Sequence, residues 1–358
     1  MKTQKFKFLL ILLLISGMAG FSHAAEISKT LHKEFKVSGN SVFTLQNKYG
    51  KVDIQNWEKN EVVIDVKIII EHPSKEKAEK LLDYFNVEFS SSGNEIKAIT
   101  KIDDRFSKIR GSDWGNGKTF SINYTVKMPK SLDINLYNKY GDTFIDELTG
   151  KAKVEVKYGN LQANKILRGD TKPLSTLVVG YGKASINEVN WMKIEIKYSK
   201  LEIEKSRALV LLSKYSKIYV DEASSIVAES KYDVYNVGKT ENFVVEGAYS
   251  TYKLDYLGKK LHIQSKYTHT SVDKIPATFE EIDIKNSYGG VKLGIDSNAS
   301  YRLEGEAKYS DISFPSGGKM NKIRGNTSSS YEGVVGSDPD PKAKINIVTS
   351  YGGVKLNY

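Results

Sequence analysis

The chain has 358 residues, a formal net charge of +10 and no cysteine. The lack of cysteine excludes thiol catalysis, disulfides and every cysteine-based metal site. The length favours two domains or an elongated repeat over one compact core, and the positive charge fits either a solvated surface of mixed sign or attraction to an anionic partner.

The first residues have the pattern of a secretory signal peptide. Lys2, Lys5 and Lys7 form a basic region, and residues 8–15 form an apolar core that is too short to span a bilayer. Small residues at the end of the segment predict cleavage after Ala24. We therefore expect residues 1–24 to be removed and the remainder to be exported, to the periplasm or the cell surface, without a transmembrane segment and without a nucleic-acid partner.

Residues 25–57 are predicted to form the first strands and the first coil of a repeat. The tetrapeptide at residues 47–50, Asn-Lys-Tyr-Gly, recurs at residues 138–141, and a short strand pattern follows both copies. The first coil is therefore expected to be interrupted by an α+β insertion, or N-terminal cap, over residues 58–130. Such a cap would cover unpaired strand edges at the end of the repeat.

The insertion contains the one convincing helix pattern of the chain, over residues 74–85, with Ser74 as a potential N-cap. Alternating apolar residues predict strands over residues 95–101 and 120–128. The segment between them, residues 103–118, is a glycine-rich and charged loop that contains Trp114. This tryptophan is either part of a plain surface loop or a ligand contact.

From residue 140 onward a tyrosine recurs at nearly regular spacing, and a small or polar residue usually follows it. Four consecutive spacings are 17 residues, and apolar residues alternate on both sides of the tyrosine. Short strands at this period bury a core only when stacked, so the pattern predicts an all-β, parallel β-solenoid (β-helix) of about twelve short coils over residues 131–358. The repeating positions are Tyr140, Tyr158, Tyr181, Tyr198, Tyr215, Tyr232, Tyr249, Tyr267, Tyr288, Tyr309, Tyr331 and Tyr351.

The alternation places each tyrosine on the apolar face, so we expect an inward-pointing structural ladder rather than a sugar-stacking platform. Small residues two positions earlier, such as Ser213 and Gly247, would leave room for the ring of an adjacent coil and, where they are serines, bind its hydroxyl. The expected ladder comprises Tyr158, Tyr181, Tyr198, Tyr215, Tyr232, Tyr249 and Tyr267.

A lysine precedes many of these tyrosines and has the opposite parity, so it is expected to face solvent. Stacking would place these lysines about one strand spacing apart, where like charges repel. Either nearby acids such as Glu195 and Glu229 relieve this repulsion, or the lysines form a stripe for an anionic ligand. The candidate stripe comprises Lys197, Lys214, Lys231 and Lys266.

The last repeat, around Tyr351, has no recognisable cap after it. An uncapped coil exposes a strand edge, so self-association through the C-terminal coil is an open alternative.

No catalytic or metal-binding motif is recognisable, and we expect no enzyme activity and no cofactor. His262 and His269 lack a metal-ligand spacing. Asp338 and Asp340 lie in a Pro-rich turn that could hold Ca²⁺ weakly, although a plain turn explains them equally. Because β-solenoids include polysaccharide lyases and hydrolases, a site assembled from distant coils remains the alternative.

The chain resembles a family of uncharacterised bacterial exported proteins with β-strand repeats and a domain of unknown function, whose members are labelled "putative adhesins". The resemblance rests on the signal peptide, the segment at residues 48–54, the helix, the strand ending at Met128, and the Tyr-Gly pairs at Tyr140 and Tyr158. It implies attachment or an envelope role, and it supplies no catalytic residue.

Together these observations predict an exported cell-envelope or surface adhesin that binds a polymer or protein partner, such as an anionic glycan or an envelope protein, through its solenoid faces. The alternatives are a polysaccharide-active β-helix enzyme and a periplasmic partner in envelope-stress signalling, the latter implied only by the resemblance.

Overall fold

The computed structural model describes residues 25–358 except 107, 109–117 and 317. It is nearly all-β, with a long, mostly parallel and solenoid-like sheet that does not close, in agreement with the predicted class. The number of coils and the domain boundaries stay predictions. The expected signal peptide and Trp114 lie outside the described residues, and none of the helices within them is long and apolar enough to cross a membrane.

The chain divides into two compact units. Within the described residues, one unit lies in residues 25–30, 67–86 and 101–121, and the other in residues 31–66, 87–100 and 122–358. Strands at the start of the chain are β1 (Ala25–Lys36), β4 (Glu61–His72), β5 (Phe85–Ser92), β6 (Glu95–Ile102) and β7 (Thr119–Met128). The strands predicted over residues 95–101 and 120–128 are thus confirmed by β6 and β7.

The first unit contains helix α2 (Lys75–Leu82). The hydroxyl of Ser74 accepts a hydrogen bond from the backbone N–H of Lys77 at 3.4 Å, which confirms the predicted N-cap. The helix ends at Leu82 instead of continuing to Phe85, because Phe85 opens β5 and is buried against the rings of Phe106 and Phe120.

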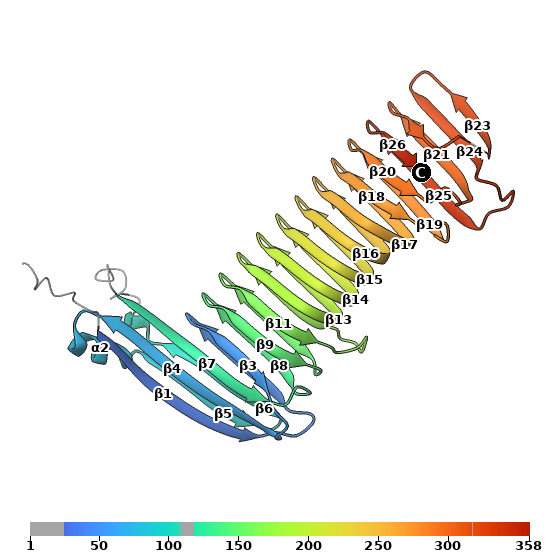
Figure 1. Ribbon diagram of the computed structural model, residues 1–358. Helices are drawn as coiled ribbons and strands as arrows, with labels where there is room; N and C mark the ends of the chain where they lie inside the picture. Colours follow the sequence, from blue (N-terminus) through green and yellow to red (C-terminus); the bar gives the residue numbers. More distant parts are fainter. Residues whose placement is uncertain (1–24, 107, 109–117, 317) are drawn as a thin grey trace, which may run out of the picture. The chain divides into compact units, whose positions relative to one another are not determined.

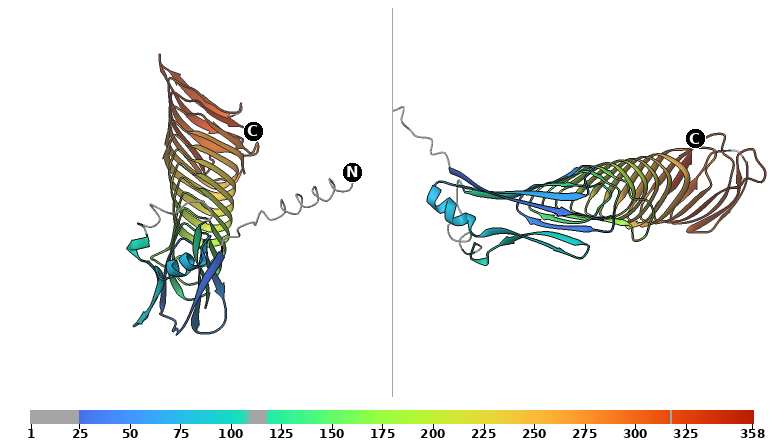
Figure 2. Two further views of the ribbon diagram at one scale, coloured as in Figure 1. Left: turned by 90° about the vertical axis from the view of Figure 1, so that its left-hand side faces the viewer. Right: turned by 90° about the horizontal axis from the view of Figure 1, so that it is seen from below.

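The second unit is a stack of coils in which each strand pairs in parallel with the corresponding segment of the neighbouring coil (Figures 1 and 2). The pairing is in register, so that Leu201 lies beside Ile218 and Ile218 beside Tyr235. Its strands are β2 (Val42–Lys48), β3 (Val52–Asn56), β8 (Asp133–Lys139), β9 (Thr143–Leu148), β10 (Ala152–Lys157), β11 (Leu161–Ile166), β12 (Ser175–Gly180), β13 (Lys183–Lys197), β14 (Lys200–Lys214), β15 (Lys217–Lys231), β16 (Val234–Ala248), β17 (Thr251–Lys266), β18 (His269–Ile275), β19 (Glu281–Ser287) and β20 (Val291–Ile295).

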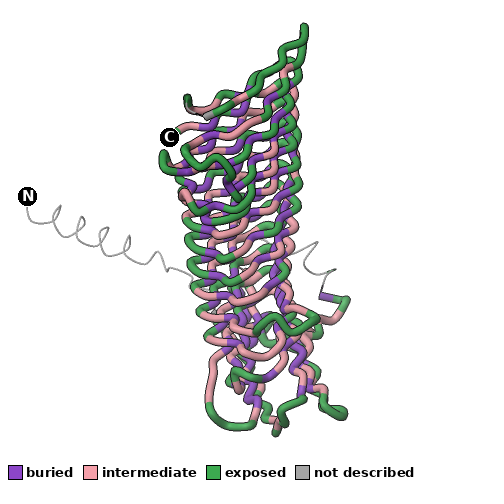
Figure 3. The backbone as a smooth tube through the Cα atoms, turned by 90° about the vertical axis from the view of Figure 1, so that its right-hand side faces the viewer, coloured by how far each residue is buried: buried purple, intermediate pink, exposed green. Residues whose placement is uncertain are grey.

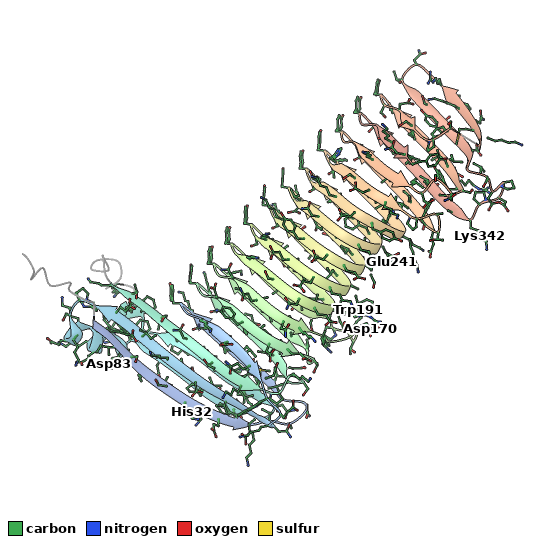
Figure 4. All side chains as sticks on the ribbon, in the orientation of Figure 1. His32, Asp83, Asp170, Trp191, Glu241 and Lys342 are labelled. Carbon is green, nitrogen blue, oxygen red and sulfur yellow. The ribbon has the colours of Figure 1, made fainter. Side chains whose placement is uncertain are left out.

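Period-two alternation builds the core of this stack. In β14, Leu209 and Leu211 are fully buried while Val210 and Leu212 are partly exposed, and Figure 3 shows the same alternation along the other strands. Each fully buried aliphatic side chain contributes about 1.5–3 kcal/mol relative to its exposed state. Trp191 and Glu241 in Figure 4 lie where β13 and β16 turn, so each long strand has two segments on different faces.

At both ends of the stack, spatial order departs from sequence order. The coil of β2 and β3 lies between β6 and β7 on one side and β8 and β9 on the other. Likewise β25 (Ala343–Ser350) lies between β19 and β21 (Tyr301–Lys308), and β26 (Val354–Asn357) lies between β20 and β22 (Ile312–Ser313). The expectation that the coil around Tyr351 offers an unpaired edge for self-association is therefore wrong, because coils flank it on both sides.

The strand edge beyond that coil is a hairpin of β23 (Gly318–Arg324) and β24 (Ser328–Val335), with β24 antiparallel to β21. Tyr331 lies inside β24, is 2% exposed and donates a hydrogen bond to Asp311. The prediction that Tyr331 is a repeat tyrosine is wrong, because the segment around it pairs as an antiparallel hairpin. Lys319, Lys322 and Arg324 make the outer strand strongly charged, which disfavours pairing with a further strand.

Candidate functional site

A ladder of twelve tyrosines follows the corners of the stack. Each has a left-handed backbone with φ between 51° and 68°, and adjacent rings stack with centroids 4.8–5.1 Å apart. In spatial order the tyrosine ladder is Tyr49, Tyr140, Tyr158, Tyr181, Tyr198, Tyr215, Tyr232, Tyr249, Tyr267, Tyr288, Tyr351 and Tyr309.

These rings point outward, and the predicted inward orientation is wrong. From Tyr140 onward the ladder tyrosines are 39–53% exposed. Alternation assigns a side chain to a face only while the backbone stays extended. The left-handed conformation at the corner reverses the side-chain direction, so the parity counted along the preceding strand does not apply to the tyrosine.

The outward ladder presents ring edges and hydroxyls rather than ring faces. Both faces of Tyr215, for example, are covered, by Tyr198 and by Tyr232. A sugar ring stacks on an aromatic face, and the inner members of the ladder have none to offer. What remains accessible is a row of phenolic groups, which can donate and accept hydrogen bonds, at the spacing of the strands.

The small residues before the corners make room for other tyrosines. Ser213 hydrogen-bonds the hydroxyl of Tyr235 at 2.6 Å, and a Cβ on Gly247 would overlap the hydroxyl of Tyr252. Tyr235 and Tyr252 are fully buried, and burial raises the pKa of both phenols. The space predicted beside these small residues is present, but the buried core tyrosines occupy it and the tyrosines of the ladder do not.

A shallow groove of about 1210 Å³ runs along the strand segments that precede the corners. We call it the lysine groove. Small side chains such as Ser230, Gly247 and Ser265 contribute to its lining, and longer charged side chains rise beside them. Its charged lining residues are Glu195, Lys197, Lys214, Glu229, Lys231, Glu246, Lys266 and Lys285.

All four lysines of the predicted stripe line this groove. Lys197, Lys214 and Lys231 lie in register on three adjacent strands, and Ala248 separates Lys231 from Lys266. Of the acids expected to relieve their repulsion, Glu195 does so for Lys197 at 2.7 Å, and this hydrogen bond raises the pKa of Lys197.

The other lysines of the groove are not neutralised in this way. Within the part of the chain that the structure describes, no carboxylate forms an ion pair with Lys214, Lys231, Lys266 or Lys285. Lys214 and Lys231 instead lie 5.3 and 5.8 Å from the ring centroids of the tyrosines that follow them. Such contacts retain the positive charge.

Two residues of the groove, Lys285 and Glu246, are not predicted from the sequence. Lys285 lies three positions before its tyrosine and therefore falls outside the pattern of lysines directly before a tyrosine. Glu229 and Glu246 are register partners on adjacent strands and face the groove together. Only the pairing register shows that these two carboxylates are neighbours.

The remaining candidates are explained by local contacts. His262 lies 2.9 Å from Asp283, and no group of three or more metal-ligating side chains occurs among the described residues, at His269 or elsewhere. The backbone N–H of Asp340 donates to the Asp338 carboxylate at 3.0 Å, as in a turn, and Asp340 pairs with Arg302.

No protein-family model matches the chain, and no curated protein does. Solved structures with some likeness include a "putative cell adhesion protein" from Clostridium sporogenes, with a TM-score of 0.20 and 10% identity over 92% of this chain and 99% of that one. A "putative adhesin" from Bacteroides fragilis has a TM-score of 0.28 and 11% identity, and a "putative lipid binding protein" from Parabacteroides distasonis has 0.26 and 12%, each over 92% of this chain and 97% of that one. Likenesses this weak carry no argument about function.

Proposed function

We propose that the protein is an exported attachment protein of the bacterial cell envelope that binds an extended anionic glycan along the lysine groove. One observation carries the proposal. Lys214, Lys231, Lys266 and Lys285 line one groove on the stack of paired strands, and no carboxylate among the described residues forms an ion pair with them.

The strand spacing explains why a polymer suits this surface. Parallel pairing places Lys214 and Lys231 on adjacent strands whose backbones lie about 4.8 Å apart, and like charges at this spacing raise the energy of the folded state. A ligand with regularly spaced negative charges would relieve that repulsion at several positions at once. Each contact is weak alone, but linked contacts raise the overall affinity strongly.

The tyrosine ladder adds a second row of contacts beside the lysines. Lys214 precedes Tyr215 and Lys231 precedes Tyr232, so ammonium groups and phenolic hydroxyls border the same strand ends. Ammonium groups bind carboxylate or sulfate, and phenolic hydroxyls bind sugar hydroxyls. An acidic polysaccharide carries both kinds of group along its length.

The test is binding of residues 25–358 to acidic and neutral polysaccharides at low and moderate salt, with product analysis on the same samples. We expect salt-sensitive binding to acidic chains such as polygalacturonate, without shortening of the chains. The variant Lys214→Gln/Lys231→Gln should bind at least tenfold more weakly. Its matched control, Lys253→Gln/Lys292→Gln, removes two exposed lysines from the strand segments that follow the corners and should bind normally. Equal binding by both variants would contradict the proposal.

A polysaccharide-active enzyme is the second candidate, because Glu229 and Glu246 face the groove side by side. Glycosidases act with two carboxyl groups that flank the scissile glycosidic bond. Shortened polysaccharide chains, lost in a Glu229→Gln/Glu246→Gln variant, would replace the attachment proposal with catalysis. A failure to bind any polysaccharide would favour a protein partner in the envelope instead.

A further inference from the structure

A second groove, of about 460 Å³, lies on the strand segments that follow the tyrosine corners. It crosses β3, β9, β11 and β13, where the residues of each coil pair in register with those of the next. We call it the amide groove. Its outward side chains are Asp53, Gln55, Phe144, Asp146, Gln162, Asn164, Ser185 and Asn187.

The charge of the amide groove differs from that of the chain as a whole. The protein has a net charge of +10, yet the lining of this groove contains two aspartates and neither lysine nor arginine. The lysines beside it are engaged: Lys51 pairs with Asp53 at 3.2 Å, and Lys183 pairs with Glu202 at 2.6 Å. An anionic polymer would therefore meet repulsion here instead of attraction.

Uncharged hydrogen-bonding groups dominate the floor of the groove. The side-chain amide of Asn187 donates to the carbonyl oxygen of the Asn164 side chain at 3.1 Å, which orients both amides. Among the described residues, no side-chain hydrogen bond or ion pair engages Gln162 or Asp146. Each amide can donate and accept at once, and a sugar hydroxyl does the same.

Two further groups suit a sugar. The carboxylate of Asp146 can accept from hydroxyl groups in charge-assisted hydrogen bonds. Phe144 supplies an apolar surface between the polar columns, and Lys51 lies over its ring at 4.8 Å. The volume is within the range of small-ligand sites and suits a short stretch of a chain rather than a globular partner.

We infer that the amide groove is a second binding site, which takes a neutral oligosaccharide. It shares no residue with the lysine groove, so the inference does not depend on the proposed anionic ligand. One molecule that binds an acidic polymer on one face and a neutral glycan on another would bridge two components of an envelope or matrix.

The inference is tested by calorimetric titration of residues 25–358 with neutral gluco-, manno- and galacto-hexasaccharides, and separately with oligogalacturonate. We expect saturable binding of at least one neutral hexasaccharide, and no competition from oligogalacturonate for this site. Asn164→Ala/Asn187→Ala should weaken the binding at least tenfold. Gln162→Ala is a second variant that removes no internal contact among the described residues, and it should weaken binding without a change in thermal stability.

Two controls separate this site from the first. Lys214→Gln/Lys231→Gln should bind the neutral ligand normally, and Asn236→Ala, an exposed-face amide farther along the same column, should do so as well. The inference is overturned if none of the neutral hexasaccharides binds saturably, or if both groove variants bind as the unaltered protein does.

Discussion

The ends and the middle of the stack build the same tyrosine corner with different chemistry. Toward both ends a glycine follows the tyrosine, except at the last corner, where Ser310 follows Tyr309. At Gly141 and Gly352, a Cβ would overlap the backbone of the neighbouring coil. At Gly141, the side-chain amide of Asn138 donates to the carbonyl oxygens of Gly50 and Gly141, at 3.2 and 3.0 Å. At these corners, buried carbonyls are satisfied by side-chain donors.

In the middle, a side chain that accepts hydrogen bonds takes the place of the glycine. The backbone N–H of Ser199 donates to the Ser216 hydroxyl at 3.3 Å, that of Ser216 to the Asp233 carboxylate at 2.7 Å, and that of Asp233 to the Ser250 hydroxyl at 3.1 Å. Here the buried N–H groups are the ones satisfied. The left-handed tyrosine thus tolerates either solution, provided that no buried polar backbone group is left unpaired.

The largest effect is expected from deletion of residues 343–358. This coil separates β19 and β20 from β21 and β22, so its loss leaves the final hairpin without the strand that joins it to the stack. Hydrogen exchange should show protection lost in β21–β24 and retained in β13–β17. Deletion of Tyr358 alone is the control. Persistent protection of β21–β24 would mean that the intercalated order is wrong.

The next largest loss of stability is expected when the glycine that follows a tyrosine near the end of the stack is replaced by the serine found in the middle. In Gly141→Ser, the new Cβ would overlap the Gly50 carbonyl, so we expect destabilisation of about 3 kcal/mol. Gly39→Ser is the matched control, because its surroundings are open, and it should change the unfolding free energy by less than about 0.5 kcal/mol. If Gly141→Ser is tolerated, the two kinds of corner are interchangeable.

Asp233 provides the corresponding test in the middle. Its buried carboxylate accepts from the hydroxyls of Ser213 and Ser230 and from the N–H groups of Ser216 and Lys231. Asp233→Ala leaves these donors unpaired and should also cost about 3 kcal/mol in chemical denaturation. The exposed Asp255→Ala should be nearly neutral.

Asp233 also predicts a pH dependence. Burial raises the pKa of its carboxyl above the usual value despite the hydrogen bonds, so the folded state holds the proton more tightly than the unfolded chain does. Stability from this group is therefore present below the ordinary aspartate pKa and is lost as the pH rises through the raised folded pKa. Asp233→Asn should remove that part of the decline when unfolding is followed across mildly acidic pH. An identical pH profile in the variant would exclude this role.

The ladder itself should show the smallest of these effects. Tyr215→Ala removes two stacking contacts worth about 0.5–1.5 kcal/mol each, which is about 1–3 kcal/mol in total, and alanine bears the same left-handed backbone cost that the tyrosine already bears. Tyr215→Gly loses the same contacts but adopts the backbone freely, so it should be about 1 kcal/mol more stable than the alanine variant. Tyr215→Phe keeps the stack and should be almost neutral. Equal stability of the glycine and alanine variants would contradict a backbone cost at the corner.

Sequence periodicity predicted the repeat, the parallel pairing and the capped helix because these features depend on local pattern. It failed at the tyrosines, where a left-handed residue reverses a side chain without any change in the alternation around it. It failed at Tyr331 as well, since a tyrosine in a hairpin and a tyrosine at a corner look alike in spacing.

The spatial order of the coils could not be predicted from the sequence, for a different reason. Similar repeats carry no signal that says which of them are neighbours, so nothing near Tyr351 indicates that its coil lies before that of Tyr309. The candidate site was partly predictable, through the lysines that precede tyrosines. Lys285, the pair of Glu229 and Glu246, and the amide groove depend on register between coils and became visible only in the structure.

The central claim is that an anionic polymer binds along the lysine groove, and the salt dependence of binding tests it most directly. We would measure the affinity of oligogalacturonates of increasing length for the unaltered protein and for Lys214→Gln/Lys231→Gln over a series of salt concentrations. The groove predicts affinity that increases with oligomer length, together with a flatter salt dependence in the variant. Affinity that is independent of length, or an unchanged salt dependence in the variant, would contradict it.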